Sequence, residues 1–120
     1  MSIRKRSDRE YSAHLQGTLD LLILRTLVVG RGHGQGIARA ILQQSDNVLI
    51  VDHGSLYPAL QRLEDRGFIE AEWGVSENNR KARFYAITRE GRKELVREES
   101  EWRRIANAIG RILGPSSAKA

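Results

Sequence analysis

The feature that most constrains the fold of this chain is a change in hydrophobic periodicity after residue 68. In the segment 69–75, apolar residues alternate with glutamate or glycine, which is the pattern of a half-buried strand. The polar run at residues 76–79 predicts a turn, and the segment Arg83 to Ile87 predicts the partner strand. The chain is therefore expected to form one β-hairpin.

Three helices are predicted before this hairpin. The segment 15–29 is apolar on nearly every side, which is typical of a helix at the centre of a core. A second helix is expected over about 35–44, and a third from the N-cap Asp52 to about Arg66. The spacing of its apolar residues predicts that the third helix buries Leu56, Ala59, Leu60 and Leu63.

A long helix is predicted after the hairpin, from the N-cap Thr88 to a stop at Gly114-Pro115. At about 1.5 Å per residue such a helix extends about 40 Å, which is longer than the body from which it grows. A heptad stripe, interrupted at Glu98, runs along it through Leu95, Trp102, Ile105, Ile109 and Ile112. Because the body offers little unclaimed apolar surface for it to fold back on, we expect a homodimer with this stripe as its interface.

The order helix, helix, helix, hairpin, long helix predicts a winged helix–turn–helix fold, mostly α with one β-hairpin. In this fold the second and third helices form the turn unit, and the hairpin is the wing. The expected organisation is a flexible basic tail over 1–12, a winged-helix domain over 13–88, a C-terminal dimerisation helix over 89–113 and a disordered tail over 114–120.

The composition indicates the chemical class of the partner and the compartment to expect. Lys and Arg number 20 against 15 Asp and Glu, a formal net charge of +5, which favours a polyanionic partner. No apolar stretch has the length of a signal peptide or a membrane span, so a cytoplasmic protein that does not enter the membrane is expected.

No group of residues predicts catalysis, a cofactor or a metal site. The sequence has no Cys, which excludes cysteine nucleophiles and thiolate metal ligands. The run Asp-His-Gly-Ser at 52–55 holds the residue types of a hydrolase triad, but neighbours on one helix point apart. The glycines between residues 30 and 36 match no phosphate-binding loop, and the three His are far apart with no carboxylate at ligand spacing. The protein is therefore not expected to be an enzyme.

The third helix and the wing are the candidate contacts with double-stranded DNA. Once the apolar face of the third helix is buried, its outward polar residues can reach bases or phosphates from the major groove. These residues are Ser55, Tyr57, Gln61 and Arg62, and Gly54 permits close backbone approach. The alternative for Tyr57 is an aromatic residue at the edge of the core.

Basic residues concentrate in and just after the hairpin. Arg80, Lys81 and Arg83 follow the predicted turn, where a hairpin tip can meet a phosphate backbone. The alternative is a solvated hairpin whose charges only protect its edges. After a three-helix unit, DNA contact is the stronger interpretation.

Several blocks of sequence together carry a family resemblance. The most specific is Gly-Ser-Leu-Tyr-Pro-Ala-Leu-Gln-Arg-Leu-Glu at 54–64, followed by Arg-Phe-Tyr at 83–85 in the wing and by Thr-Arg-Glu-Gly at 88–91. With the block at 15–24, they resemble the PadR family of bacterial transcriptional regulators over about residues 13–113. The runs at 77–80 and 101–104 are similar to a short-chain subgroup often found in acidobacteria.

This resemblance implies a dimeric repressor whose last helix forms the dimer. It implies that Ser55, Tyr57 and Pro58 lie in the DNA-reading helix and Arg80, Lys81 and Arg83 in the wing. Many members of the family respond to small aromatic compounds, so Trp102 is a candidate for stacking on such an effector. We favour the alternative in which Trp102 fills the dimer core.

The second functional hypothesis is a winged-helix module for protein–protein contacts without specific DNA binding. The basic wing argues against this hypothesis.

Overall fold

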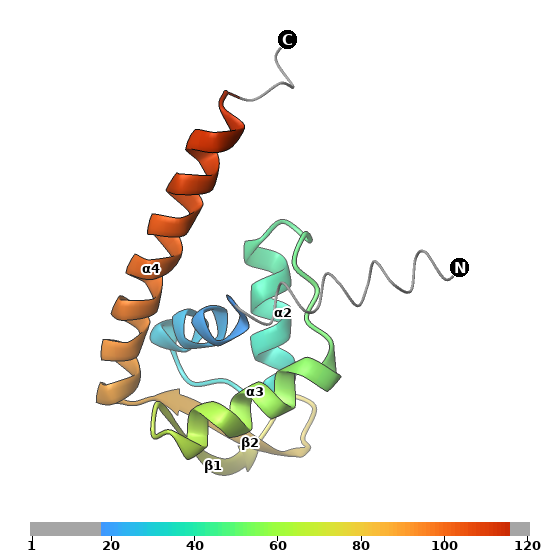
Figure 1. The fold of residues 1–120 in the computed structure, drawn as a ribbon. Coiled ribbons are helices and arrows are strands. Elements are labelled where there is room, and N and C mark those ends of the chain that lie inside the picture. The colour runs from blue at the N-terminus through green and yellow to red at the C-terminus, as the bar shows by residue number, and fades with distance from the viewer. Residues whose placement is uncertain (1–17, 116–120) are drawn as a thin grey trace.

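The computed structural model describes residues 18–115, which form the predicted winged helix–turn–helix arrangement (Figure 1). A first helix covers 18–29 and is followed by α2 (Gly34–Gln44) and α3 (His53–Asp65). The hairpin consists of β1 (Ile69–Val75) and β2 (Lys81–Ile87), and α4 spans Arg89–Leu113. The predicted tail over 1–12, the start of the first helix at 15 and most of the tail over 114–120 lie outside the described residues.

The first helix lies at the centre of the core, as predicted. Four of its side chains are buried, and Leu21, Leu22 and Val28 pack partly against the same core. Residues from every other element complete this single cluster, which comprises Leu19, Ile23, Leu24, Leu27, Ile37, Ile41, Val51, Leu56, Ala59, Leu60, Leu63, Ile69, Tyr85 and Leu95. No helix within 18–115 combines the length and the apolar character that crossing a membrane requires.

Helix α3 begins and ends where local sequence rules place it. Asp52 is the N-cap, and its Oδ1 accepts a hydrogen bond of 2.8 Å from the backbone N–H of Ser55. At the other end Gly67 adopts a φ of 80°, and the N–H groups of Gly67 and Phe68 bond back to Glu64 and Leu63. The predicted face of Leu56, Ala59, Leu60 and Leu63 is fully buried.

The wing is an antiparallel hairpin tied to the first loop of the domain. β2 begins at Lys81, two residues before the predicted start, because pairing continues to Val75↔Lys81 next to a turn in which Asn79 has a φ of 62°. Gly32 then adds a bridge to Tyr85, with backbone hydrogen bonds of 3.0 and 2.8 Å in the two directions. This bridge holds the base of the wing against the start of α2.

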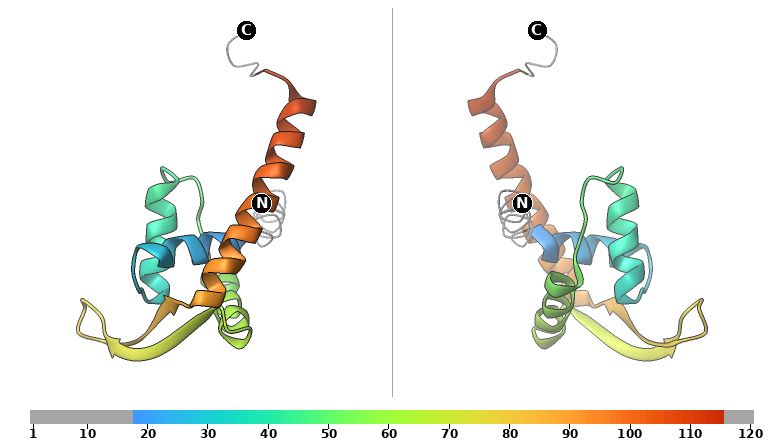
Figure 2. Two further views of the ribbon diagram at one scale, coloured as in Figure 1. Left: turned by 90° about the vertical axis from the view of Figure 1, so that its left-hand side faces the viewer. Right: turned by 90° about the vertical axis from the view of Figure 1, so that its right-hand side faces the viewer.

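Within residues 18–115, helix α4 is anchored to the domain through its first turns. The hydroxyl of Thr88 accepts from the N–H of Gly91 and donates to the carbonyl of Gly67. A Cβ on Gly91 would lie 2.0 Å from the carbonyl oxygen of Phe68, so glycine is required for this approach. Glu98, Glu99 and Trp102 still lie beside the first helix, and beyond them the helix projects from the domain; the views in Figure 2 show it rising away from the wing.

One residue of the predicted interface is already covered by its own chain. Leu95 is only 5% exposed and belongs to the core of its own chain. The heptad spacing identified an apolar stripe, but its first member lies in the anchored turns of α4, where its own domain already covers it. The exposed stripe therefore consists of Trp102, Ile105, Ile109 and Ile112.

Candidate nucleic-acid interface

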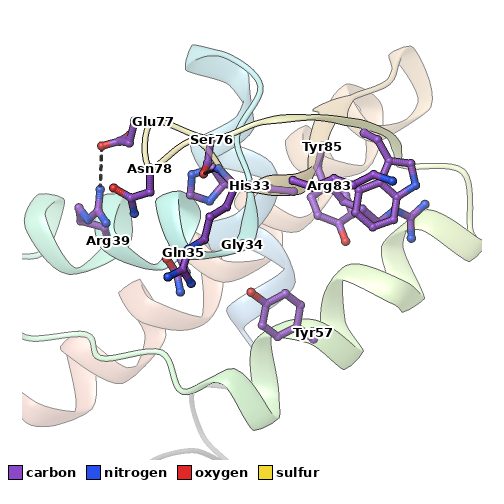
Figure 3. A pocket seen from close by; sticks show the side chains of 14 residues that line it. His33, Gly34, Gln35, Arg39, Tyr57, Ser76, Glu77, Asn78, Arg83 and Tyr85 are labelled. Atoms are coloured by element: carbon purple, nitrogen blue, oxygen red, sulfur yellow. Dashed lines mark hydrogen bonds and ion pairs between the residues drawn. The ribbon is translucent and has the colours of Figure 1, made fainter.

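A groove of about 400 Å³ separates the wing from the N-terminal ends of α2 and α3 (Figure 3). Tyr57 points into it from α3, and Arg83 and Tyr85 line it from β2. The start of α2 contributes His33, Gly34 and Gln35. The groove thus joins the two segments predicted to contact DNA, namely the third helix and the wing.

The charged residues that line this groove are predominantly cationic. Arg39, Arg80, Lys81 and Arg83 contribute to it, and Glu77 is the acidic residue in the lining. The carboxylate of Glu77 lies 3.8 Å from the guanidinium of Arg39, so these two charges offset each other. The remaining positive charge lies along the wing, where it favours an anionic ligand.

Tyr57 is held in place by a glycine of α2. A Cβ on Gly34 would lie 2.6 Å from the Tyr57 hydroxyl oxygen, so the phenol rests directly on the first turn of α2. The ring also packs edge-to-face with His53, with centroids 5.6 Å apart. Tyr57 nevertheless remains 44% exposed. It therefore combines a fixed position with a partly exposed side chain.

The other predicted residues of α3 lie in several environments. Gly54, Pro58, Gln61 and Arg62 are exposed, and Ser55 is half-buried. Gln61 donates to Asp65 over 2.9 Å, and Arg62 forms an ion pair with Asp20 of the first helix over 3.0 Å. None of these five residues lines the groove, so within the third helix Tyr57 alone connects the predicted set to it.

The three predicted wing cations differ in how far they are engaged. Arg80 and Lys81 are exposed, and neither forms an ion pair within residues 18–115. Arg83 is half-buried, and its Nη2 donates to Oε2 of Glu64 over 2.9 Å. The same pair leaves Arg83 Nε and Glu64 Oε1 buried without a partner. Arg83 therefore fixes the wing to α3, whereas Arg80 and Lys81 are available to a ligand.

The outer side of the wing is braced by contacts that the sequence did not reveal. The Arg31 guanidinium stacks on the Phe84 ring at 4.7 Å and pairs with Glu72 at 3.2 Å. A Cβ on Gly74 would lie 2.8 Å from Phe84, so the glycine makes room for this stack. His33 caps α2 by accepting from the N–H of Gly36 at Nδ1, and its ring packs edge-to-face on Phe84. The wing is consequently held at a fixed angle to α2.

A second, apolar groove of about 330 Å³ lies between α4 and the first helix. Leu21 and Leu22 line it from the first helix, Leu49 from the segment before α3, and Trp102 from α4. Trp102 is thus the stripe residue that faces this groove, while Ile105, Ile109 and Ile112 continue the exposed apolar face along the projecting part of α4.

Sequence reasoning missed Arg39 and Trp73 in the cationic groove. Arg39 lies in the second helix, for which no contact was predicted. The signal for Trp73 was present, because the hairpin register places Trp73 opposite Arg83 and therefore on the face that carries Lys81.

Comparisons with known proteins agree with this geometry. Residues 23–97 match the model of the transcriptional regulator PadR-like family. An uncharacterised protein X of Lysinibacillus sphaericus is 30% identical over 95 residues, which cover 79% of this chain and 87% of that protein.

Solved structures show the same fold. A transcriptional regulator from Clostridium thermocellum has a TM-score of 0.78 at 29% identity, covering 86% of this chain and 100% of that chain. A PadR-like transcription factor from Bacteroides fragilis has a TM-score of 0.66 at 27% identity, covering 84% of this chain and 95% of that chain. This chain belongs to the PadR-like family of transcriptional regulators.

Proposed function

We propose that this protein is a homodimeric regulator that binds specific sites in double-stranded DNA and acts as a repressor by occupying its operator. The observation that carries the proposal is the cationic groove, which combines Tyr57 of α3 with the exposed Arg80 and Lys81 of the wing. A duplex presents one negative charge about every 1.7 Å along its axis, so such a surface is complementary to it.

In the proposed complex α3 enters the major groove. Tyr57 and Ser55 contact base edges, and Gly54 at the start of the helix lets a phosphate approach the backbone. Pro58, Gln61 and Arg62 complete the outward side of the helix. Arg80 and Lys81 bind phosphates of the adjacent backbone, and Arg83 supports them by fixing the wing through Glu64.

The dimer rests on the exposed stripe of α4. Trp102, Ile105, Ile109 and Ile112 present an apolar face that extends beyond the body of the domain. A second copy would cover this face and the apolar groove beside the first helix, and two-fold symmetry would place two α3 helices on two half-sites. The repressor role is supported by the family resemblance.

A small aromatic effector is the second part of this proposal. The groove beside Trp102 is lined mainly by apolar side chains and has room for a planar molecule. An effector that stacks on Trp102 there would compete with, or be enclosed by, the partner helix. Fluorescence titration of the Trp73→Phe variant, in which Trp102 is the remaining indole, with planar aromatic compounds would test this part separately.

The competing function is a winged-helix module for protein–protein contacts. Such a module would be expected to have a neutral or acidic wing, whereas the wing of this protein carries Arg80 and Lys81 without carboxylate partners among residues 18–115. Because the wing is cationic, this hypothesis would require an acidic protein as the partner.

Selection of bound sites from random duplex DNA tests the proposal directly. We expect enrichment of a two-fold symmetric site whose half-sites are separated by about one helical turn or a multiple of it. A gel shift on the selected site and on a scrambled site then measures specificity. Equal binding to both sites, or recovery of no site, would remove sequence-specific DNA recognition and favour the protein–protein hypothesis.

A further inference from the structure

Trp73 is a large aromatic side chain that the core does not use. It lies in the outer half of β1 and is 61% exposed, although the same face of the hairpin buries Ile69 and Tyr85 nearer its base. Exposing an indole forfeits the burial that usually accounts for a Trp in a small domain. Its position therefore calls for an explanation outside the core.

The surroundings of Trp73 point to an anionic, partly apolar ligand. The Lys81 ammonium lies 5.1 Å and the Arg83 guanidinium 5.9 Å from the centroid of the indole ring. Trp73 lines the cationic groove, as do Tyr57 of α3 and Arg80 of the wing. The indole thus lies between the helix and the wing tip, with cations beside it.

A duplex backbone has matching chemistry. Its deoxyribose rings are apolar patches between phosphates, and the faces of its bases are covered by stacking, so an indole approaching from the side meets sugar. Charged side chains beside the indole would meet the flanking phosphates. A single-stranded nucleic acid would instead offer base faces for stacking.

We propose that Trp73 is a DNA-contacting residue whose indole packs on a deoxyribose of the backbone segment between α3 and the wing, while Lys81 binds a neighbouring phosphate. This inference rests on the proposed function, because it assigns a further contact to the same surface. Since a deoxyribose carries no sequence information, Trp73 contributes affinity for all duplexes equally. The alternative is a structural cross-strand pair in which Trp73 only orients Lys81 and Arg83.

The test compares Trp73→Ala and Trp73→Phe with wild type on the selected operator and on a scrambled duplex, over a range of salt concentrations. We expect Trp73→Ala to weaken binding to both duplexes by about tenfold, since each copy in the dimer loses an aromatic contact. The slope of log affinity against log salt should stay unchanged, because no charge is removed. Trp73→Phe should recover part of the loss.

Three controls separate a direct contact from other effects. Val29→Ala removes an exposed apolar side chain outside the cationic groove and should leave binding unchanged. The sequence has two Trp, so the emission change of wild type on binding duplex should be lost in Trp73→Phe, where Trp102 is the remaining indole. Thermal unfolding of each variant should match wild type because Trp73 lies outside the core.

Failure of this inference and failure of the proposed function give different results. If Trp73→Ala binds duplex like wild type, or if its salt slope falls as it would on losing Lys81, Trp73 has no direct contact and the inference is wrong while the proposed function stands. If Trp73→Ala weakens binding to single strands and not to duplex, the ligand is not a duplex backbone. If wild type binds no duplex, the proposed function fails and this inference fails with it.

Discussion

The cationic groove and the exposed stripe of α4 are both accessible surfaces, but they are built in opposite ways. The groove is cationic and is fixed from several sides, by the Arg83–Glu64 ion pair, the Gly32–Tyr85 bridge and the Tyr57–Gly34 contact. The stripe is apolar and exposed, and apart from Trp102, which lines the groove beside the first helix, it lies on a part of α4 whose ribbon stands clear of the other elements within residues 18–115 (Figures 1 and 2). A single chain therefore forms the whole cationic groove, whereas within residues 18–115 most of the stripe of α4 is left uncovered.

This difference indicates what each surface requires. A prearranged cationic groove needs only a polyanion, because its side chains are already held in position. An open apolar stripe needs another apolar surface, because water contact along a helix of this length is unfavourable. We therefore expect substitutions in the stripe to act on assembly and substitutions in the groove to act on DNA affinity.

The largest effect is expected from Ile105→Glu in the middle of the stripe. A carboxylate there would be buried without a partner in the dimer, so the variant should dissociate or unfold. Operator affinity should fall by about a hundredfold or more, because two linked half-sites can no longer be engaged together. Light scattering and a gel shift on the selected operator measure the two consequences.

The matched control is Asn107→Glu, which adds the same charge to an exposed position of α4 outside the stripe. It should remain dimeric and bind DNA with nearly normal affinity. A monomeric wild type, or an Ile105→Glu variant that stays dimeric with full DNA affinity, would show that the stripe has a different partner.

The next effect concerns the charge of the groove. Replacing both Arg80 and Lys81 with Ala should weaken binding to operator and scrambled duplex alike. Each lost phosphate contact should lower the salt slope by about 1 per protomer. Binding titrations at several salt concentrations measure this slope.

Arg89→Ala is the control for net charge, because Arg89 is an exposed cation at the start of α4 outside the groove. It should change the slope little. Equal slopes for wild type and the double variant, with intact folding, would take the wing tip out of the interface.

Rules that act over a few residues were sufficient to predict much of this molecule. The caps at Asp52 and Thr88 and the buried face of α3 follow from side-chain chemistry and spacing within one element. The hairpin follows equally from alternation and a polar turn. The pairing Arg83–Glu64 and the support of Tyr57 by Gly34 join elements that are distant in sequence, so no local pattern reports them.

Leu95 is a second case in which a local sequence pattern does not report the contact that a residue makes. A heptad spacing identifies which residues of α4 share a face, but it does not identify the surface that buries them. The anchored turns around Leu95 pack on the chain's own core, and the turns from Trp102 onward do not. Trp73 was within reach of sequence reasoning, because counting back from the turn places it beside Lys81 and Arg83 on one face.

A smaller effect, on specificity and not on overall affinity, is expected from Tyr57→Phe. Phenylalanine keeps the packing against Gly34 and removes only the hydroxyl. If that hydroxyl contacts a base, the preference for operator over scrambled duplex should fall by about 1–3 kcal/mol while non-specific binding changes little. Competition titrations with the two duplexes give the ratio. An unchanged ratio for Tyr57→Phe and for Ser55→Ala would mean that this face of α3 does not read sequence.

The smallest effect is expected at Glu98, which lies outside both surfaces on the half-buried side of α4 that faces the first helix. Burial raises the pKa of Glu98 to about 7, and a hydrogen bond with Glu94 and the nearby charges of Glu94 and Asp20 act in the same direction, while Arg97 opposes them. The pKa of Glu94 is lowered, chiefly by its hydrogen bond with Arg97. Glu98 is therefore the carboxyl group of this pair that takes up a proton as the pH falls through about 7, while Glu94 stays ionised.

This pair gives a prediction with a defined sign. Because the folded state raises the pKa of Glu98 above its ordinary value of 4.5, its contribution to stability is fully present below about pH 4.5 and is lost as the pH rises through about 7. Glu98→Gln mimics the protonated side chain, so it should raise the melting temperature at pH 8 and change it little at pH 5. Glu101→Gln, at an exposed position of α4, is the control and should show no such difference between the two pH values. Melting curves at both pH values decide the matter: if Glu98→Gln changes stability equally at pH 5 and pH 8, Glu98 does not hold the proton assigned to it.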